Sequence, residues 1–161
     1  MTDPTKPVPW STSPSQKARN AVQRSVTALL DELAPERALK RVERLPGSIE
    51  QHRTPTGCVL QTTGCAVSVS WFTESATDAP LGELHVILWN GVVARRGATR
   101  DRKGATIIRE LVLRPIEPPE DDCRWQATDG SQYDTASLAA KCLALLEEQV
   151  RLNGELPAPE R

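Results

Sequence analysis

The residues best suited to binding chemistry stand close together between two apolar stretches of the chain. Positions 95–103 read RRGATRDRK, with four arginines and one lysine against a single aspartate. These basic residues are Arg95, Arg96, Arg100, Arg102 and Lys103. Guanidinium groups form paired hydrogen bonds with phosphates and carboxylates, and loops on a rigid sheet are where binding residues gather. The basic loop 95–103 therefore indicates contact with an acidic protein partner or with nucleic-acid phosphates, and a solvated hairpin tip is the third interpretation.

A nucleophilic enzyme needs a thiol or hydroxyl beside a base, and Cys65 with His85 is the pairing that neighbouring strands could bring together. The residues around them do not match a nucleophile elbow or a triad element. Because cysteines in strands are mostly small buried hydrophobes, a cysteine-dependent enzyme ranks third among the functions considered, and no catalytic residue is assigned. The carboxylates of 117–122 stand among prolines without a fixed spacing, which predicts a solvated loop rather than an acid–base pair.

Metal and cofactor sites are not predicted. The chain has four cysteines, Cys58, Cys65, Cys123 and Cys142. None forms a Cys-x-x-Cys pair, and His52 and His85 are not spaced like zinc ligands relative to them. Without a secretory signal, such cysteines are expected to be reduced thiols. The glycines of the basic loop precede an apolar strand rather than a helix, so the usual phosphate cradle is not expected either.

Composition places the chain among ordinary globular proteins. Its 161 residues are 39% hydrophobic and 25% charged, which is enough to bury one core without metal or disulfide support. The formal net charge of -1 provides no global attraction to nucleic acid or to an anionic membrane. No apolar run approaches the roughly 18 residues that span a bilayer, and the N-terminus has no apolar segment typical of a signal peptide. A cytoplasmic protein is therefore the expectation.

The first part of the folded region is expected to be helical. Ser13 and Pro14 suit the start of a helix, and apolar residues recur at helical spacing over 14–33. A second helical piece is expected over 36–45. Residues 1–13 are rich in proline and predict a disordered arm.

The middle of the chain predicts strands. They are expected at 58–61, 65–72, 84–89, 106–116, 123–128 and 131–133. Two geometries are open after 84–89. In the preferred one, Asn90-Gly91 is a two-residue turn and 92–95 pairs back on the strand; in the other, the strand continues through a bulge at Gly91 and the basic loop is the turn.

A long C-terminal helix completes the predicted fold. Asp134 or Thr135 caps it, and Asn153-Gly154 ends it ahead of a flexible tail at 154–161. Strands grouped between helices, without alternating crossover helices, predict an α+β fold. We expect a twisted antiparallel sheet of about four to six strands, with N-terminal helices and the C-terminal helix packed on one face of a single domain over 14–153.

These expectations favour a small non-enzymatic binding or accessory module that contacts another protein through the basic loop or a sheet edge, or that pairs with itself as a homodimer. The alternative is a nucleic-acid-binding accessory protein that places the basic loop on phosphates. In that alternative, Trp71, Trp89 and Trp125 would stack on bases if they shared one exposed face of the sheet.

Overall fold

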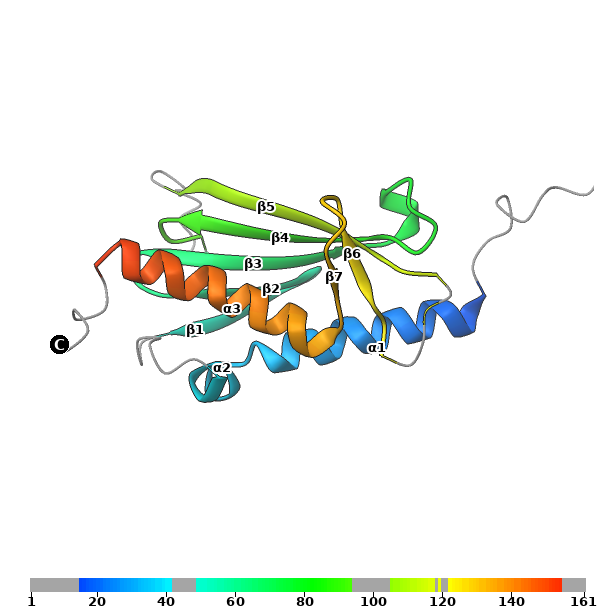
Figure 1. Ribbon diagram of the computed structural model, residues 1–161, viewed down its shortest axis with the longest axis horizontal. Helices are drawn as coiled ribbons and strands as arrows, with labels where there is room; N and C mark the ends of the chain where they lie inside the picture. Colours follow the sequence, from blue (N-terminus) through cyan, green and yellow to red (C-terminus); the bar gives the residue numbers. More distant parts are fainter. Residues whose placement is uncertain (1–14, 42–48, 94–104, 118, 120–121, 155–161) are drawn as a thin grey trace, which may run out of the picture.

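The computed structural model describes residues 15–41, 49–93, 105–117, 119 and 122–154. Within them the chain forms three α-helices, a short 3-10 turn and seven strands (Figure 1). The strands make one antiparallel sheet in which each strand pairs with the next along the chain. The predicted α+β fold is confirmed, although the sheet has more strands than expected. The predicted arm and most of the predicted tail lie outside the described residues.

The first two helices follow each other directly. α1 spans Gln16–Glu32 and is capped by Ser15, whose side-chain oxygen accepts a hydrogen bond from the Ala18 backbone N–H at 3.1 Å. This cap lies two residues after the predicted one at Ser13. α2 spans Pro35–Arg41, with the proline at the first position, where its missing N–H costs no helical hydrogen bond. The remainder of the predicted second piece lies outside the described residues.

The C-terminal helix α3, Thr135–Leu152, matches its prediction closely. Asp134 caps it with a reciprocal pair of hydrogen bonds: its carboxylate accepts from the Ser137 N–H at 2.7 Å, and the Ser137 hydroxyl accepts from the Asp134 N–H at 2.9 Å. This pair satisfies backbone N–H groups that have no partner within the helix. The helix stops at Asn153, and Gly154 follows with a φ of +72°.

The strands run across the sheet in chain order. They are β1 (Glu50–Thr54), β2 (Gly57–Gln61), β3 (Cys65–Phe72), β4 (Glu83–Asn90), β5 (Thr106–Pro115), β6 (Trp125–Ala127) and β7 (Gln132–Tyr133), with the 3-10 turn η2 (Glu74–Ala76) between β3 and β4. Strand β1 has no apolar alternation, so its sequence does not predict a strand. Its Gln51 and Arg53 side chains reach α1, where they donate hydrogen bonds to the Leu30 carbonyl and the Asp31 carboxylate, each at 3.0 Å.

The preferred prediction for Asn90-Gly91 is wrong. β4 pairs with β5 from Leu84, opposite Leu113, to Asn90, opposite Thr106, so the connection between them is the longer segment 91–105. Gly91 leaves the sheet with a φ of +104° and donates its N–H to the Gly64 carbonyl at 2.8 Å. The register does shift, but between Leu88 and Trp89 rather than at Gly91.

Helices α1 and α3 cover one face of the sheet, and the core lies between helices and strands (Figure 1). In β4, Leu84, Val86 and Leu88 are buried in this core, while the residues between them are only partly buried. Trp125 of β6 is the largest fully buried side chain. None of the helices in the described part of the chain is long and apolar enough to cross a membrane. The opposite face of the sheet has no helix over it among the described residues.

Candidate functional site

The basic loop lies outside the described residues, so the structure does not test its role. This applies to all of its predicted binding residues, Arg95, Arg96, Arg100, Arg102 and Lys103. Contact with an acidic partner or with phosphates therefore stays a prediction. What the structure does describe is the strand on either side of this loop, β4 before it and β5 after it.

The pairing of Cys65 with His85 does not form. Cys65 is fully buried in the core and lies opposite Asn90, whereas His85 lies opposite Ser70 on the other face of the sheet. Burial raises the pKa of the Cys58 thiol to about 11 and the pKa values of Cys123 and Cys142 to about 12. A thiolate nucleophile needs a lowered pKa, so these three thiols have the opposite environment.

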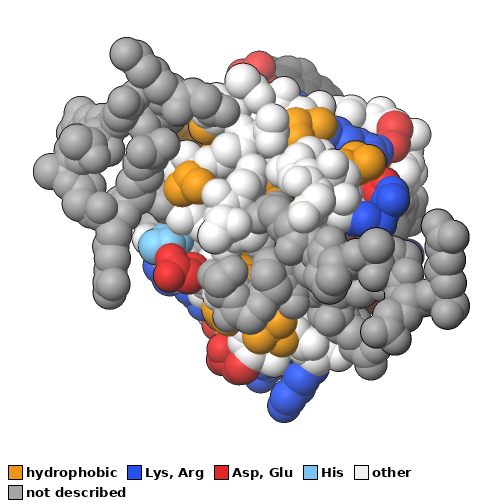
Figure 2. Space-filling model, turned by 90° about the vertical axis from the view of Figure 1, so that its left-hand side faces the viewer, with side chains coloured by type: hydrophobic (Ala, Val, Ile, Leu, Met, Phe, Trp, Pro, Cys, Tyr) orange, Lys and Arg blue, Asp and Glu red, His pale blue; other side chains and the backbone are white. Residues whose placement is uncertain are grey.

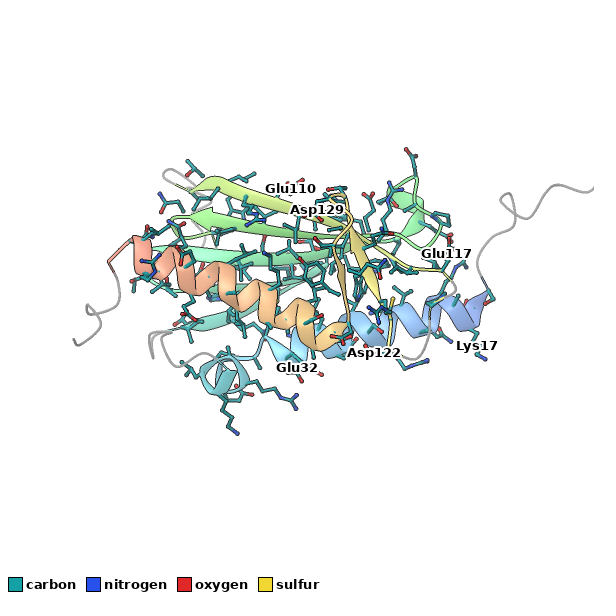
Figure 3. The ribbon with its side chains drawn as sticks, in the orientation of Figure 1. Lys17, Glu32, Glu110, Glu117, Asp122 and Asp129 are labelled. Carbon is teal, nitrogen blue, oxygen red and sulfur yellow. The ribbon has the colours of Figure 1, made fainter. Side chains whose placement is uncertain are left out.

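The described residues contain no group of three or more His, Cys, Asp or Glu side chains that could hold a metal ion. Charged side chains are instead distributed around the molecule. Figure 3 labels Lys17, Glu32, Glu110, Glu117, Asp122 and Asp129, which lie on α1, on β5 and in the connections after β5 and β6, and do not converge on one point. Carboxylate pairs held at a fixed separation, as acid–base chemistry demands, are not found among these labelled residues.

The three tryptophans do not share a face. Trp71 and Trp125 pack edge to face on the helix side, with ring centroids 5.7 Å apart and an interplanar angle of 78°. Trp125 is fully buried. Trp89 lies on the opposite face, because it alternates with the core residue Leu88. The suggested stacking platform for bases is therefore wrong.

The face of the sheet opposite α1 and α3 is called the outer face below; several strands contribute to it, and no helix of the described residues lies over it. We define it by the residues that alternate with core positions: Val59, Gln61, Ala66, Ser68, Ser70, Phe72, Glu83, His85, Ile87, Trp89, Ile107, Glu110, Val112 and Arg114. Val59 and Ala66 are buried without belonging to the core on the helix side. Part of the outer face is therefore inaccessible to solvent.

Trp89 is the aromatic residue at the apolar end of the outer face, near the end of β4. Its indole N–H donates a hydrogen bond to the Ser68 hydroxyl at 2.9 Å, and Ser68 is only 8% exposed. The register sets Trp89 between Ala66 on β3 and Ile107 on β5. Partly buried tryptophans held in one orientation are frequent anchors of protein interfaces.

The other end of the outer face is charged. Glu83 accepts hydrogen bonds from the Arg114 guanidinium at 2.8 Å and from the His85 ring at 3.3 Å, and His85 packs edge to face on Phe72. The bonds from Arg114, and then those from His85, hold the pKa of Glu83 below its usual range. These residues line an open groove of about 590 Å³, together with Asp78 and other residues of the β3–β4 connection.

Strand β5 has one edge that is only partly paired among the described residues, and its unpaired part is called the free edge below. β6 pairs with it only over Leu113–Pro115, and the Thr128 N–H then donates to the Val112 carbonyl at 3.2 Å. Residues 106–111 have β4 on one side and no described strand on the other, and Figure 1 shows β5 as the outermost strand there. Ile107 and Ile108 on this stretch are 55% and 44% exposed.

Figure 2 views the end of the molecule where β4 ends and β5 begins. Hydrophobic side chains reach the surface there at several separate points, and charged side chains lie toward the margin of the view. Comparisons of the chain with protein-family models, with curated proteins and with solved structures gave no match. Function must therefore be inferred from the outer face and the free edge of β5.

Proposed function

We propose that this chain is a protein-binding module that engages its partner through the free edge of β5 and the adjoining apolar end of the outer face. The observation that carries the proposal is the exposure of Ile107 and Ile108 on a strand that lacks a described neighbour on one side. Exposed β-branched residues beside unpaired backbone groups form a template for the addition of another strand.

The surrounding residues support a protein partner over a small ligand. Trp89 supplies an anchor fixed by Ser68, and the group of Glu83, His85 and Arg114 supplies a charged margin on the same face. Protein interfaces combine an apolar centre with a polar rim in this way. Small-molecule sites are instead concave and enclose most of their ligand, whereas the outer face is open.

Site-specific photo-crosslinking tests the proposal. A photoreactive amino acid replaces Ile107 in the full chain, and a matched chain carries it at Ala140, an exposed position on α3. We expect discrete cross-linked protein adducts from position 107 and none of the same size from position 140. Adducts from neither position, or the same adducts from both, would contradict the proposal.

Reversing the charge of the basic loop distinguishes the nucleic-acid alternative from the protein-binding proposal. If phosphates bind the basic loop, changing Arg95, Arg96, Arg100 and Arg102 to Glu abolishes oligonucleotide binding in a low-salt fluorescence-anisotropy assay. The protein-binding proposal expects no oligonucleotide binding by the wild-type chain, and adducts from position 107 that survive this charge reversal. Salt-sensitive oligonucleotide binding that Ile107→Lys leaves intact would favour the alternative.

A further inference from the structure

We infer that the β5 edge binds the same edge of a second copy of this chain, in an antiparallel pair that joins two sheets into one. This inference rests on the proposed protein-binding function and names the partner. It follows from the backbone of the edge, from the side chains on it and from the low net charge of the chain.

The backbone determines what kind of structure can cover the edge. The Val112 carbonyl accepts from Thr128, directly after β6, and the Ile116 N–H donates to the Arg124 carbonyl, directly before β6, at 2.8 Å, so these even-numbered residues direct their backbone groups toward β6. Because direction alternates along a strand, Glu110 directs its N–H and C=O to the same side, beyond the point where β6 pairing ends. Among the described residues, no hydrogen bond to either of these groups is found. An extended strand satisfies both groups, whereas a helix cannot.

The side chains on each edge determine which kind of strand can pair with it favourably. Of the sheet's outer edges in the described chain, β1 is polar throughout, with the sequence EQHRT, and β7 has two residues. The free half of β5 is apolar at Ile107 and Ile108. A strand that covers two exposed isoleucines gains most from β-branched or aromatic side chains of its own. Every further copy of the chain carries such a strand, already held in extended form by β4.

A two-fold axis between Ile107 and Ile108 gives a pairing that fits the available length. It sets Ile107 opposite the partner subunit's Ile108 and Thr106 opposite the partner subunit's Arg109. The paired stretch then falls within 105–110 in both copies, before β6 begins to pair. The register of β5 against β4 shifts at this point. Arg109 lies opposite Leu88 and Ile107 lies opposite Trp89, so Ile108 between them is an extra residue without an opposite on β4.

Symmetry and charge favour a closed pair. Because the same edge is used on both copies, the contact leaves no apolar edge free for a third copy, and growth into a fibre stops. The bulge and the charged Arg109-Glu110 pair restrict the edge to a short register, as edge strands commonly require. With a net charge of -1, two copies approach each other almost without long-range repulsion.

Sedimentation equilibrium of the full chain over a wide concentration range tests the inference. The wild-type chain is compared with Ile107→Lys, Ile108→Lys and the control Leu152→Lys, which replaces a third exposed hydrophobic residue, 63% exposed at the end of α3. We expect the wild-type chain and the control to approach twice the chain mass of 17.7 kDa. Lysine on the edge should raise the dimer dissociation constant by at least about tenfold.

Circular dichroism confirms that each variant keeps its fold, which is expected because the replaced side chains are exposed. A wild-type chain that stays at 17.7 kDa at every concentration overturns the inference. So does a dimer that both edge variants leave intact, or one that Leu152→Lys weakens equally. If the wild-type chain is monomeric but position 107 still cross-links other proteins, the second copy is rejected and the proposed function is retained. Without any adduct from position 107, the proposed function fails as well.

Discussion

Trp89 illustrates how one hydrogen bond prepares a surface side chain for contact. Its N–H is bound to the Ser68 hydroxyl on the neighbouring strand, and this bond restricts the indole to one orientation over β3. A side chain that is already ordered loses less entropy when a partner covers it. The same bond contributes to folding, because the Ser68 hydroxyl is nearly inaccessible to water.

Replacing Ser68 separates these two contributions. Ser68→Ala removes the acceptor and should lower the free energy of unfolding by about 1 kcal/mol. Ser70→Ala is the matched control, since Ser70 lies on the same strand and face and has no such bond to an indole. Urea denaturation of both variants provides the measurement. Equal losses of stability would show that the bond to Trp89 is not responsible.

The Glu83 group predicts a dependence of stability on pH. Its pKa is lowered in the folded chain, first by hydrogen bonds from Arg114 and then by those from His85. A carboxyl group with a lowered folded pKa adds stability above its unfolded pKa, and this stability is lost as the pH falls through the folded pKa. Arg114→Ala should therefore reduce the loss of unfolding free energy between roughly pH 5 and pH 3.

Denaturation across this pH range is compared for the wild-type chain, Arg114→Ala, Glu83→Gln and the double variant. In the Glu83→Gln background, the change at Arg114 should no longer alter the pH dependence, because the titrating carboxyl group is absent. If Arg114→Ala has the same effect in both backgrounds, Arg114 acts through another group.

The burial of the cysteines predicts that their thiols react slowly with reagents in the folded chain. All four are buried and none is in a disulfide, and for Cys58, Cys123 and Cys142 burial also raises the pKa. Ellman's reagent at mildly alkaline pH should react slowly with the folded chain and with all four thiols in denaturant. Fast reaction of any thiol in the folded chain would contradict the burial described here and reopen a chemical role for it.

At the scale of elements, the sequence predicted the helices and strands that are specified by neighbouring residues along the chain. The helix over 135–152 has a cap, an apolar face and a stop signal, and the structure reproduces all three. The strand over 65–72 matches its prediction because its alternation is regular. β1 could not be found in the same way, since it is polar and is held by its pairing with β2 and by side-chain bonds to α1.

The Asn90-Gly91 prediction failed for a related reason. Gly91 does adopt a positive φ, as the turn would require, but β4 pairs with β5 rather than with the residues that follow Gly91. The partner of a strand depends on residues far away in the sequence, and the turn preference of two neighbouring residues contains no information about them. The candidate edge also depends on long-range pairing. The sequence indicated that a sheet edge could bind a partner, but only the short pairing of β6 identifies this edge as that of β5.

The cap of α3 gives a prediction at this scale. Asp134→Ala should lower the free energy of unfolding by about 1 kcal/mol, because it removes the hydrogen bond to the Ser137 N–H. Asp134→Asn should retain most of this stability, since asparagine also caps helices. Asp78→Ala, at an exposed loop position, is the control. Thermal denaturation that ranks the alanine and asparagine variants equally would contradict the capping role.

At the scale of the whole molecule, the fold gives the sheet two faces with different surroundings. One face is buried under α1 and α3, and its residues are explained by the core. The outer face has a fixed tryptophan and a charged group and borders on an apolar free edge, none of which the core requires. This asymmetry is the reason for proposing that protein binding involves the outer face and the β5 edge.

Amide hydrogen exchange of Glu110, followed by NMR at low and high protein concentration, tests this assignment most directly. Its N–H points to the free edge of β5 and should become protected when a strand pairs with that edge. We expect slower exchange at Glu110 as the chain associates, with no such change in Ile107→Lys. Association that leaves the exchange of the Glu110 amide unchanged would contradict pairing at the β5 edge.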